Sequence, residues 1–253
     1  MRHILGCLRR AVQDFHMIRS GDAIAVGVSG GKDSLVLLQA LALYRRFSPE
    51  PFTLEAFTLT MGFEPFDTAD VAVFCQALEV PYTVRSTQIA RVIFEERKEK
   101  NPCSLCANMR RGALHDLAIE KGCNKLALGH HRDDAIETFF LSLFYEGRLH
   151  TFSPVTWMSR KDITVIRPLL YVPEKQIIGY ARKEQLPIIH NPCPANGNTQ
   201  RQAMKDLIKQ LTKTMPKTPE MMLSALRNVE EYGLWDKMTR RPDDPWEPKE
   251  IRS

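Results

Sequence analysis

The sequence lacks any apolar run that approaches the roughly 18 to 20 residues needed to span a bilayer. The longest such run, residues 35–44, already contains Gln39. Arg9 and Arg10 interrupt the start of the chain before an apolar stretch can form, so we expect no secretory signal. These absences predict a protein that has no membrane partner and is located in the reducing cytoplasm.

The composition also lacks the extremes that mark disordered, collagen-like or coiled-coil chains. Hydrophobic residues make up 43% and charged residues 26% of the 253 residues, which is typical of a globular protein large enough to bury its own core. A net charge of +5 is compatible with a polyanionic partner but does not require one. Tryptophans are few, and we identify no aromatic platform for stacked bases.

Short apolar strands alternate with helical patterns over the first 144 residues. After residue 150 proline becomes more frequent, and we expect a less regular C-terminal portion with a hairpin arm over 164–167 and helices over 174–184 and 199–211. Repeated strand–helix units are typical of an α/β fold with a doubly wound parallel sheet. The strands are predicted over 22–28, 54–60, 82–85 and 125–129, and the helices over 4–15, 34–44, 68–78, 105–120 and 133–144.

A glycine-rich loop, Ser29-Gly30-Gly31-Lys32-Asp33-Ser34, follows the first predicted strand and leads directly into a helix. Two glycines let backbone N–H groups close around an anion, the helix N-terminus adds partial positive charge, and Lys32 adds a full one. The spacing matches neither the Walker A loop nor the dinucleotide fingerprint. The loop therefore predicts a pyrophosphate site; the alternative is a plain turn in which Asp33 or Ser34 caps the helix.

Cys103 and Cys106 are the only closely spaced cysteine pair, one helical turn apart. Cys193 lies far along the chain between two prolines. Three cysteines can hold an iron–sulfur cubane, whereas His190 could complete a zinc site with the same thiolates, and the spacing leaves both alternatives open. The remaining cysteines fall in or beside predicted helices, and we interpret them as structural: Cys7, Cys75 and Cys123.

Residues 129–134 (Gly-His-His-Arg-Asp-Asp) fall where a strand ends and a helix begins, the edge of an open α/β sheet at which ligands bind. Asp133 could take Mg²⁺ or polarise a nucleophile; the alternative is a helix cap or a pair with Arg132. The basic residues suit phosphate or carbonyl recognition, although each could equally belong to a solvated helix face: Arg110, Arg111, Arg201, Lys205 and Lys209.

Taken together, the glycine loop, the Cys103-Ser-Leu-Cys106 pair with Arg110-Arg111-Gly112, and the 129–134 segment with Glu137-Thr138 resemble the tRNA 2-thiocytidine biosynthesis (TtcA-like) family of the PP-loop ATP pyrophosphatase superfamily. The resemblance covers roughly residues 20–210. It implies an adenine nucleotide alpha hydrolase-like fold and cleavage of ATP between its α- and β-phosphates. It also implies a 4Fe-4S cluster held by Cys103, Cys106 and Cys193.

We accordingly predict three groups of site residues. Lys32, Asp133 and Arg110 are the predicted catalytic residues. The residues expected to bind RNA are Arg111, Arg132, Arg201 and Lys205. The glycine loop, one strand end and the histidine segment are expected to bind ATP: Ser29, Gly30, Gly31, Lys32, Asp33, Ser34, Thr60, Gly129, His130 and Asp134.

The predicted activity is ATP-dependent thiolation of an anticodon-loop cytidine in tRNA, with Mg²⁺, a cysteine desulfurase or other sulfur donor, and a possible homodimer. The alternatives are a lysidine-type RNA ligase with a structural zinc site and a non-catalytic nucleotide sensor or sulfur-carrier module. The predicted organisation is an N-terminal helix over 1–20, a PP-loop domain with the cysteine site over 21–215, and a C-terminal helix with a polar tail over 216–253.

Overall fold

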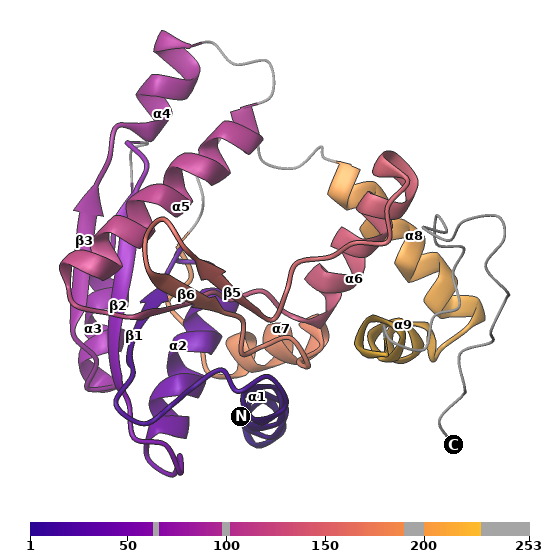
Figure 1. Ribbon diagram of the computed structural model, residues 1–253, viewed down its shortest axis with the longest axis horizontal. Coiled ribbons are helices and arrows are strands. Elements are labelled where there is room, and N and C mark those ends of the chain that lie inside the picture. The colour runs from indigo at the N-terminus through magenta and orange to yellow at the C-terminus, as the bar shows by residue number, and fades with distance from the viewer. Residues whose placement is uncertain (63–65, 98–101, 190–199, 229–253) are drawn as a thin grey trace, which may run out of the picture.

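A computed structural model of the protein describes residues 1–62, 66–97, 102–189 and 200–228. Its centre is a six-stranded sheet with the order β3-β2-β1-β4-β6-β5 (Figure 1). Every neighbouring pair is parallel except β5 and β6, which form an antiparallel hairpin. The strands are β1 (Ala23–Gly27), β2 (Thr53–Thr60), β3 (Tyr82–Ser86), β4 (Lys125–Ala127), β5 (Val155–Met158) and β6 (Ile163–Ile166).

Helices connect these strands and cover the sheet. Two of them continue into short π-helical turns, η1 after α4 and η2 after α6. The helical elements are α1 (Arg2–Asp14), α2 (Lys32–Arg45), α3 (Ala69–Ala77), α4 (Ile89–Arg91), η1 (Val92–Glu96), α5 (Pro102–Glu120), α6 (Arg132–Leu141), η2 (Ser142–Glu146), α7 (Glu174–Lys183), α8 (Gln200–Thr214) and α9 (Thr218–Arg227).

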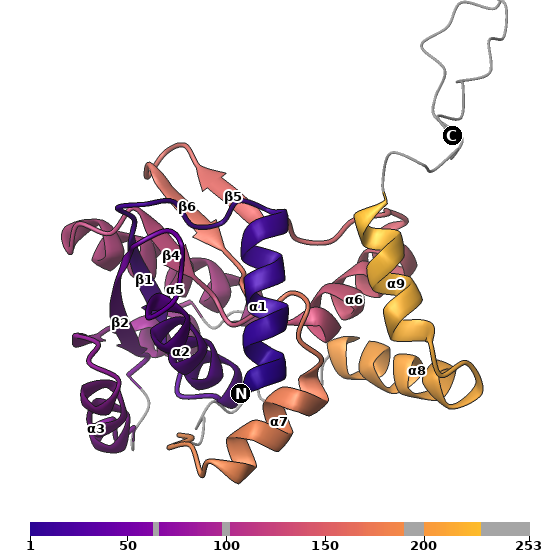
Figure 2. The same ribbon diagram turned by 90° about the horizontal axis from the view of Figure 1, so that it is seen from below.

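The two faces of the sheet belong to two different hydrophobic clusters, because successive side chains of a strand point to opposite faces. Ile24 and Val26 of β1 pack in a large cluster with α1, α2 and α7, whereas Ala25 packs with α5 on the other face. This arrangement confirms the doubly wound α/β fold. A third, small cluster lies apart from the sheet and joins α6, α8 and α9 (Figure 2).

The predicted strands and helices of the first 144 residues are present, and so is the hairpin arm, which is β6. The sequence did not predict β5, nor the helical turns over residues 89–96. Both are short elements of three to five residues, too short for a hydrophobic period to be visible. In the part of the chain that the structure describes, no helix combines the length and the apolar character that a membrane span requires.

Candidate nucleotide and cysteine site

The glycine loop joins the end of β1 to the start of α2, as the sequence predicts. Gly30 has a φ of +79°, and a Cβ there would lie 2.9 Å from the Cβ of Ile189, so the position requires glycine. The hydroxyl of Ser34 braces the loop: it accepts from the Ser29 N–H at 3.1 Å and donates to the Gly31 carbonyl at 2.9 Å. Gly31 then caps α2 in an extended conformation, which presents the unpaired first-turn N–H groups of the helix to an anion.

The 129–134 segment packs directly against this loop. A Cβ at Gly129 would lie 3.1 Å from the backbone of both Asp33 and Ser34, so glycine lets the first turn of α2 approach this closely without a shift. His131 caps α6 through a reciprocal pair of hydrogen bonds with Asp134. Its Nε2 also lies 3.6 Å from Oδ1 of Asp33. The two motifs, about 100 residues apart in sequence, therefore form one site at the carboxyl ends of β1 and β4.

Lys32 is held by two carboxylates. Its Nζ lies 3.0 Å from Oδ2 of Asp33 and 3.2 Å from Oε1 of Glu174, whose other oxygen lies 2.7 Å from Nζ of Lys205. Burial alone would lower the pKa of Lys32, but the two carboxylates outweigh it and raise that pKa. Burial opposes ionisation of Glu174 as well, yet Lys205 and Lys32 lower its pKa. Lys32 is thus a charged ammonium beside the glycine loop.

The acidic residues of the segment also brace neighbouring helices. Oδ2 of Asp133 accepts from the backbone N–H of Glu174 at 2.8 Å and so caps α7. Arg201 of α8 bridges Oδ1 of Asp134 at 3.1 Å and Oε2 of Glu137 at 3.3 Å. These bonds bring the starts of α6, α7 and α8 together around Lys32.

Two buried groups in the site have displaced pKa values. Burial raises the pKa of Glu137 to about 7, with a further increase from the charge of Asp134 and a partial offset from Arg201. Burial lowers the pKa of His130 to about 4, so its imidazole is neutral near pH 7. The His130 ring lies 4.9 Å from the ring of Phe152.

The predicted basic residues differ in how exposed they are and in whether they are paired with carboxylates. Arg110 and Arg111 are exposed on α5. Arg201 and Lys205 are partly exposed but already paired with carboxylates of the site. Arg132 is only 7% exposed, and its guanidinium pairs with Glu220 and Asp133. A buried and paired guanidinium cannot reach an RNA phosphate, so we assign Arg132 to the packing of α6 against α9 instead.

Three of the cysteines are buried, and two lie at the start of α5. Cys7, Cys75 and Cys123 are buried, and burial raises the pKa of Cys75 and of Cys123 to about 11, which suits inert structural thiols. Cys103 and Cys106 lie in the first turns of α5, and Cys106 is partly exposed. Thiolates one turn apart at a helix N-terminus suit an iron–sulfur cluster or zinc. The predicted third ligand, Cys193, and the alternative zinc ligand His190 lie outside the described residues.

Thr60 is the last residue of β2 and lies at the same sheet edge as the glycine loop, where its carbonyl accepts from both the backbone N–H and the hydroxyl of Thr87. Within the described ranges, no three His, Cys, Asp or Glu side chains are arranged to hold a metal ion.

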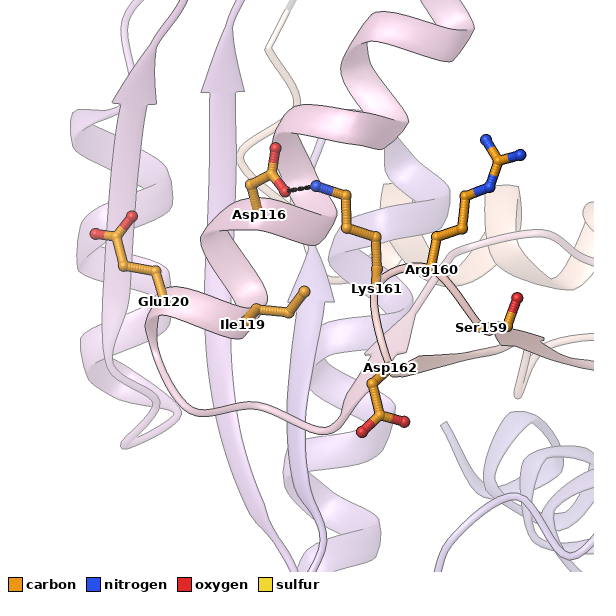
Figure 3. A pocket seen from close by; sticks show the side chains of 7 residues that line it. All are labelled: Asp116, Ile119, Glu120, Ser159, Arg160, Lys161 and Asp162. Atoms are coloured by element: carbon orange, nitrogen blue, oxygen red, sulfur yellow. Dashed lines mark hydrogen bonds and ion pairs between the residues drawn. The ribbon is translucent and has the colours of Figure 1, made fainter.

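An open pocket of about 510 Å³ lies at the opposite sheet edge, between the end of α5 and the β5–β6 turn, and an ion pair of Lys161 with Asp116 crosses it (Figure 3). Because it lies before the first residues of β4 and β6, it is not part of the candidate site.

Residues 6–211 match the model of a family described as a PP-loop domain. The class of protein is therefore a PP-loop protein, in agreement with the glycine loop. Two relatives, each called tRNA-cytidine(32) 2-sulfurtransferase, are 41% identical: that of Geobacter metallireducens, over 95% of both chains, and that of Neisseria meningitidis serogroup A, over 93% of this chain and 74% of the relative. The chain belongs to the tRNA 2-thiocytidine biosynthesis family, a family of sulfurtransferase enzymes within the PP-loop superfamily.

A solved structure agrees with this fold. It is the U34-tRNA thiolase NcsA from Methanococcus maripaludis with its 4Fe-4S cluster, which is 25% identical to this chain with a TM-score of 0.73. The alignment covers 91% of this chain and 79% of the thiolase.

Three residues that the structure places in the site were not among the predicted site residues: His131, Glu137 and Glu174. His131 and Glu137 belong to the motifs described above. Their spacing, however, does not distinguish a helix-capping histidine or a buried carboxyl from the polar residues beside it. Glu174 follows Pro173 at a helix start, a position where an acidic residue is ordinarily expected to complement the helix dipole. Only the fold shows that this carboxylate links two lysines.

Proposed function

We propose that the protein adenylates the C2 oxygen of an anticodon-loop cytidine in tRNA with ATP and replaces that oxygen with sulfur. The relatives at 41% identity are called tRNA-cytidine(32) 2-sulfurtransferase, and the structural relative is a tRNA thiolase. The observation that carries the proposal is the packing of Gly129 on the first turn of α2, because it joins an anion-binding loop to the histidine–aspartate segment in one site.

The reaction needs activation because the oxygen of an amide-like carbonyl is a poor leaving group, whereas AMP is a good one. The C2 oxygen attacks the α-phosphorus of ATP, and the bond to the β-phosphate breaks. The glycine-loop N–H groups and the charged ammonium of Lys32 stabilise the departing pyrophosphate. Glu174 positions Lys32 for this task, since it and Asp33 both hold Nζ by ion pairs.

Mg²⁺ would offset the remaining phosphate charge. We propose that Asp133 and Asp134, at the start of α6, offer it carboxylate oxygens, with Thr60, His130 and the rest of the loop around the nucleotide.

The donor set at the start of α5 fits an iron–sulfur cluster, because two cysteines one turn apart stand at a helix N-terminus that favours thiolates. In our proposal Cys103, Cys106 and Cys193 hold a 4Fe-4S cluster. Bound there, such a cluster would supply an iron that can carry the incoming sulfur. Arg110, exposed one turn after Cys106, would orient the carbonyl that is replaced.

In this proposal, Arg111, Arg201 and Lys205 supply positive charge for the tRNA backbone. A cysteine desulfurase or a similar donor would deliver the sulfur in the cytoplasm, where thiolate ligands stay reduced. A homodimer would be compatible with this arrangement.

Removal of one cysteine tests the proposal. Anaerobically reconstituted protein should thiolate tRNA with ATP and a sulfur source. Cys193→Ala should lose most of its iron and its thiolation activity, whereas its ATP affinity should equal that of the wild type. Cys7→Ala, which removes a buried structural thiol, serves as the control. Full thiolation by Cys193→Ala would refute the cluster role, and zinc in place of iron in the wild type would support the ligase alternative.

A further inference from the structure

Exposed apolar side chains gather on η2 and the turn after it. Phe144 is 57% exposed, Tyr145 52% and Leu149 55%. The segment is a π-helical turn that continues α6 and ends at Gly147, which has a φ of +63°. Single π-helical turns within α-helices occur frequently at functional sites. Nothing in the ATP chemistry described above uses this surface.

The ring of Phe144 is held in place by the end of α6. The Phe144 ring stacks on the ring of Phe140 with a centroid distance of 5.5 Å and an interplanar angle of 26°. Phe140 is buried and packs with Ile136 of α6 and Met204 of α8 in the third hydrophobic cluster. Phe144 is therefore fixed on one side and exposed on the other, so a partner that stacks on it loses little entropy in ordering it.

A cation accompanies the rings. Arg148 is exposed, and its backbone N–H donates to the carbonyl of Ser142 at 3.0 Å, which fixes the turn against η2. Among the residues that the structure describes, no carboxylate forms an ion pair with Arg148. An exposed arginine in the turn that follows exposed aromatic residues suits a ligand with flat bases and phosphates, because aromatic rings stack on bases and a guanidinium pairs with the backbone phosphates.

Helix α6 connects this surface to the nucleotide site. The helix begins at the His131 cap, and a rise of about 1.5 Å per residue places Phe144 about 18 Å beyond Arg132. Figure 1 shows the turn after η2 at the far end of α6 from the sheet, on the same upper side of the molecule as the start of α5 with Cys103 and Cys106.

We propose that Phe144, Tyr145 and Arg148, the η2 platform, bind unpaired bases and the backbone of the tRNA loop that carries the reacting nucleotide. This inference rests on the proposed function. Sequence-specific RNA recognition relies on stacking of unpaired bases, and an exposed arginine with a net charge of +5 on the chain favours a polyanion over a second copy of the same protein.

The test is tRNA binding by the full chain, measured by fluorescence anisotropy with whole tRNA at several salt concentrations. Phe144→Ala/Tyr145→Ala should weaken binding about tenfold without a change in the salt dependence. Arg148→Ala should reduce the slope of log affinity against log salt by about one. ATP binding without RNA should stay unchanged in both variants, and circular dichroism should show that they are folded.

Phe47→Ala is the matched control. Phe47 is 54% exposed and its ring packs on the buried Tyr44 at 5.3 Å, but it lies at the other sheet edge, beyond the end of α2. We expect it to bind tRNA like the wild type.

If the wild type binds tRNA and the double variant binds it equally well, the role proposed for the η2 platform is wrong and the proposed function stands. If the wild type binds no tRNA, both are wrong. A wild-type dimer that dissociates in the double variant, with unchanged tRNA affinity, would assign the surface to a second copy.

Discussion

Helix α2 carries Lys32 and helix α8 carries Lys205, the two lysines that pair with Glu174, but the two helices are held by different forces. The side chains of α2 from Leu35 to Leu38 are fully buried in the main core. In contrast, α8 has one buried side chain, Met204, which packs in the small cluster with α6, and it contacts the site through ion pairs of Arg201 and Lys205. Apolar burial is not weakened by charge screening, whereas partly exposed ion pairs are. The nucleotide loop is thus rigidly built, and the α8 side of the site depends on charge.

The largest expected effect comes from a substitution that disturbs the packing of the first turn of α2 against Gly129. Gly129→Ala would place a Cβ 3.1 Å from the backbone of Asp33 and Ser34, so the first turn of α2 must shift. We expect a loss of about 1–3 kcal/mol in the free energy of unfolding and at least about a tenfold loss of ATP affinity. Isothermal calorimetry and denaturant unfolding measure the two quantities.

Gly179→Ala is the control for this change, because a Cβ at that position in α7 meets nothing within 4 Å. It should leave ATP binding unchanged and stabilise the protein by up to about 1 kcal/mol, since alanine favours a helix. Equal ATP affinity of Gly129→Ala and Gly179→Ala would show that the loop is not rigid.

An intermediate effect concerns pH. The ordinary pKa of a Glu is 4.5 and burial raises that of Glu137 to about 7, so between these values the folded protein holds a proton that the unfolded chain has released. The contribution of Glu137 to stability is therefore present at low pH and is lost as pH rises from 4.5 to 7. Between pH 4.5 and 8, the wild type should lose up to about 3 kcal/mol relative to Glu137→Gln.

Unfolding by urea at several pH values measures this difference. Glu184→Gln, which changes an exposed carboxylate at the end of α7, should reproduce the pH dependence of the wild type. If Glu137→Gln keeps the wild-type pH dependence, Glu137 is ionised throughout, and the charge balance described around α8 must be revised.

The smallest expected effect concerns the salt dependence of α8. Arg201→Ala removes the bridge to Asp134 and Glu137, in which the arginine side chain is 44% exposed, and should cost about 0.5 kcal/mol. Hydrogen exchange should accelerate in α8 at low salt and leave α2 unchanged, and high salt should reduce the difference. Lys209→Ala, at another exposed basic position of α8, should change neither helix. Faster exchange in α2 would contradict the division between the two helices.

The sequence predicted what depends on local pattern. Strand–helix alternation gave the doubly wound fold, and the two glycines beside Lys32 gave the nucleotide loop. The sequence did not predict contacts between distant segments, such as the link from Lys32 through Glu174 to Lys205. The burial of charged residues was also not predictable from the sequence. Arg132, beside two aspartates, is as polar in sequence as Arg201, yet it is buried and pairs with Glu220 of α9. The spacing of Phe144 is that of a core residue. Only the structure shows that its ring is exposed, in the π-helical turn after α6.

The contact between Ile189 and Gly30 limits where the third cysteine can be. The Ile189 N–H donates to the Gly30 carbonyl at 2.9 Å, and Cys193 follows four residues later. Four residues of polypeptide extend no farther than about 14 Å, whatever path they take. Covalent connectivity alone therefore keeps the Cα atom of Cys193 within this reach of Ile189, a residue that hydrogen-bonds the loop proposed to bind the triphosphate.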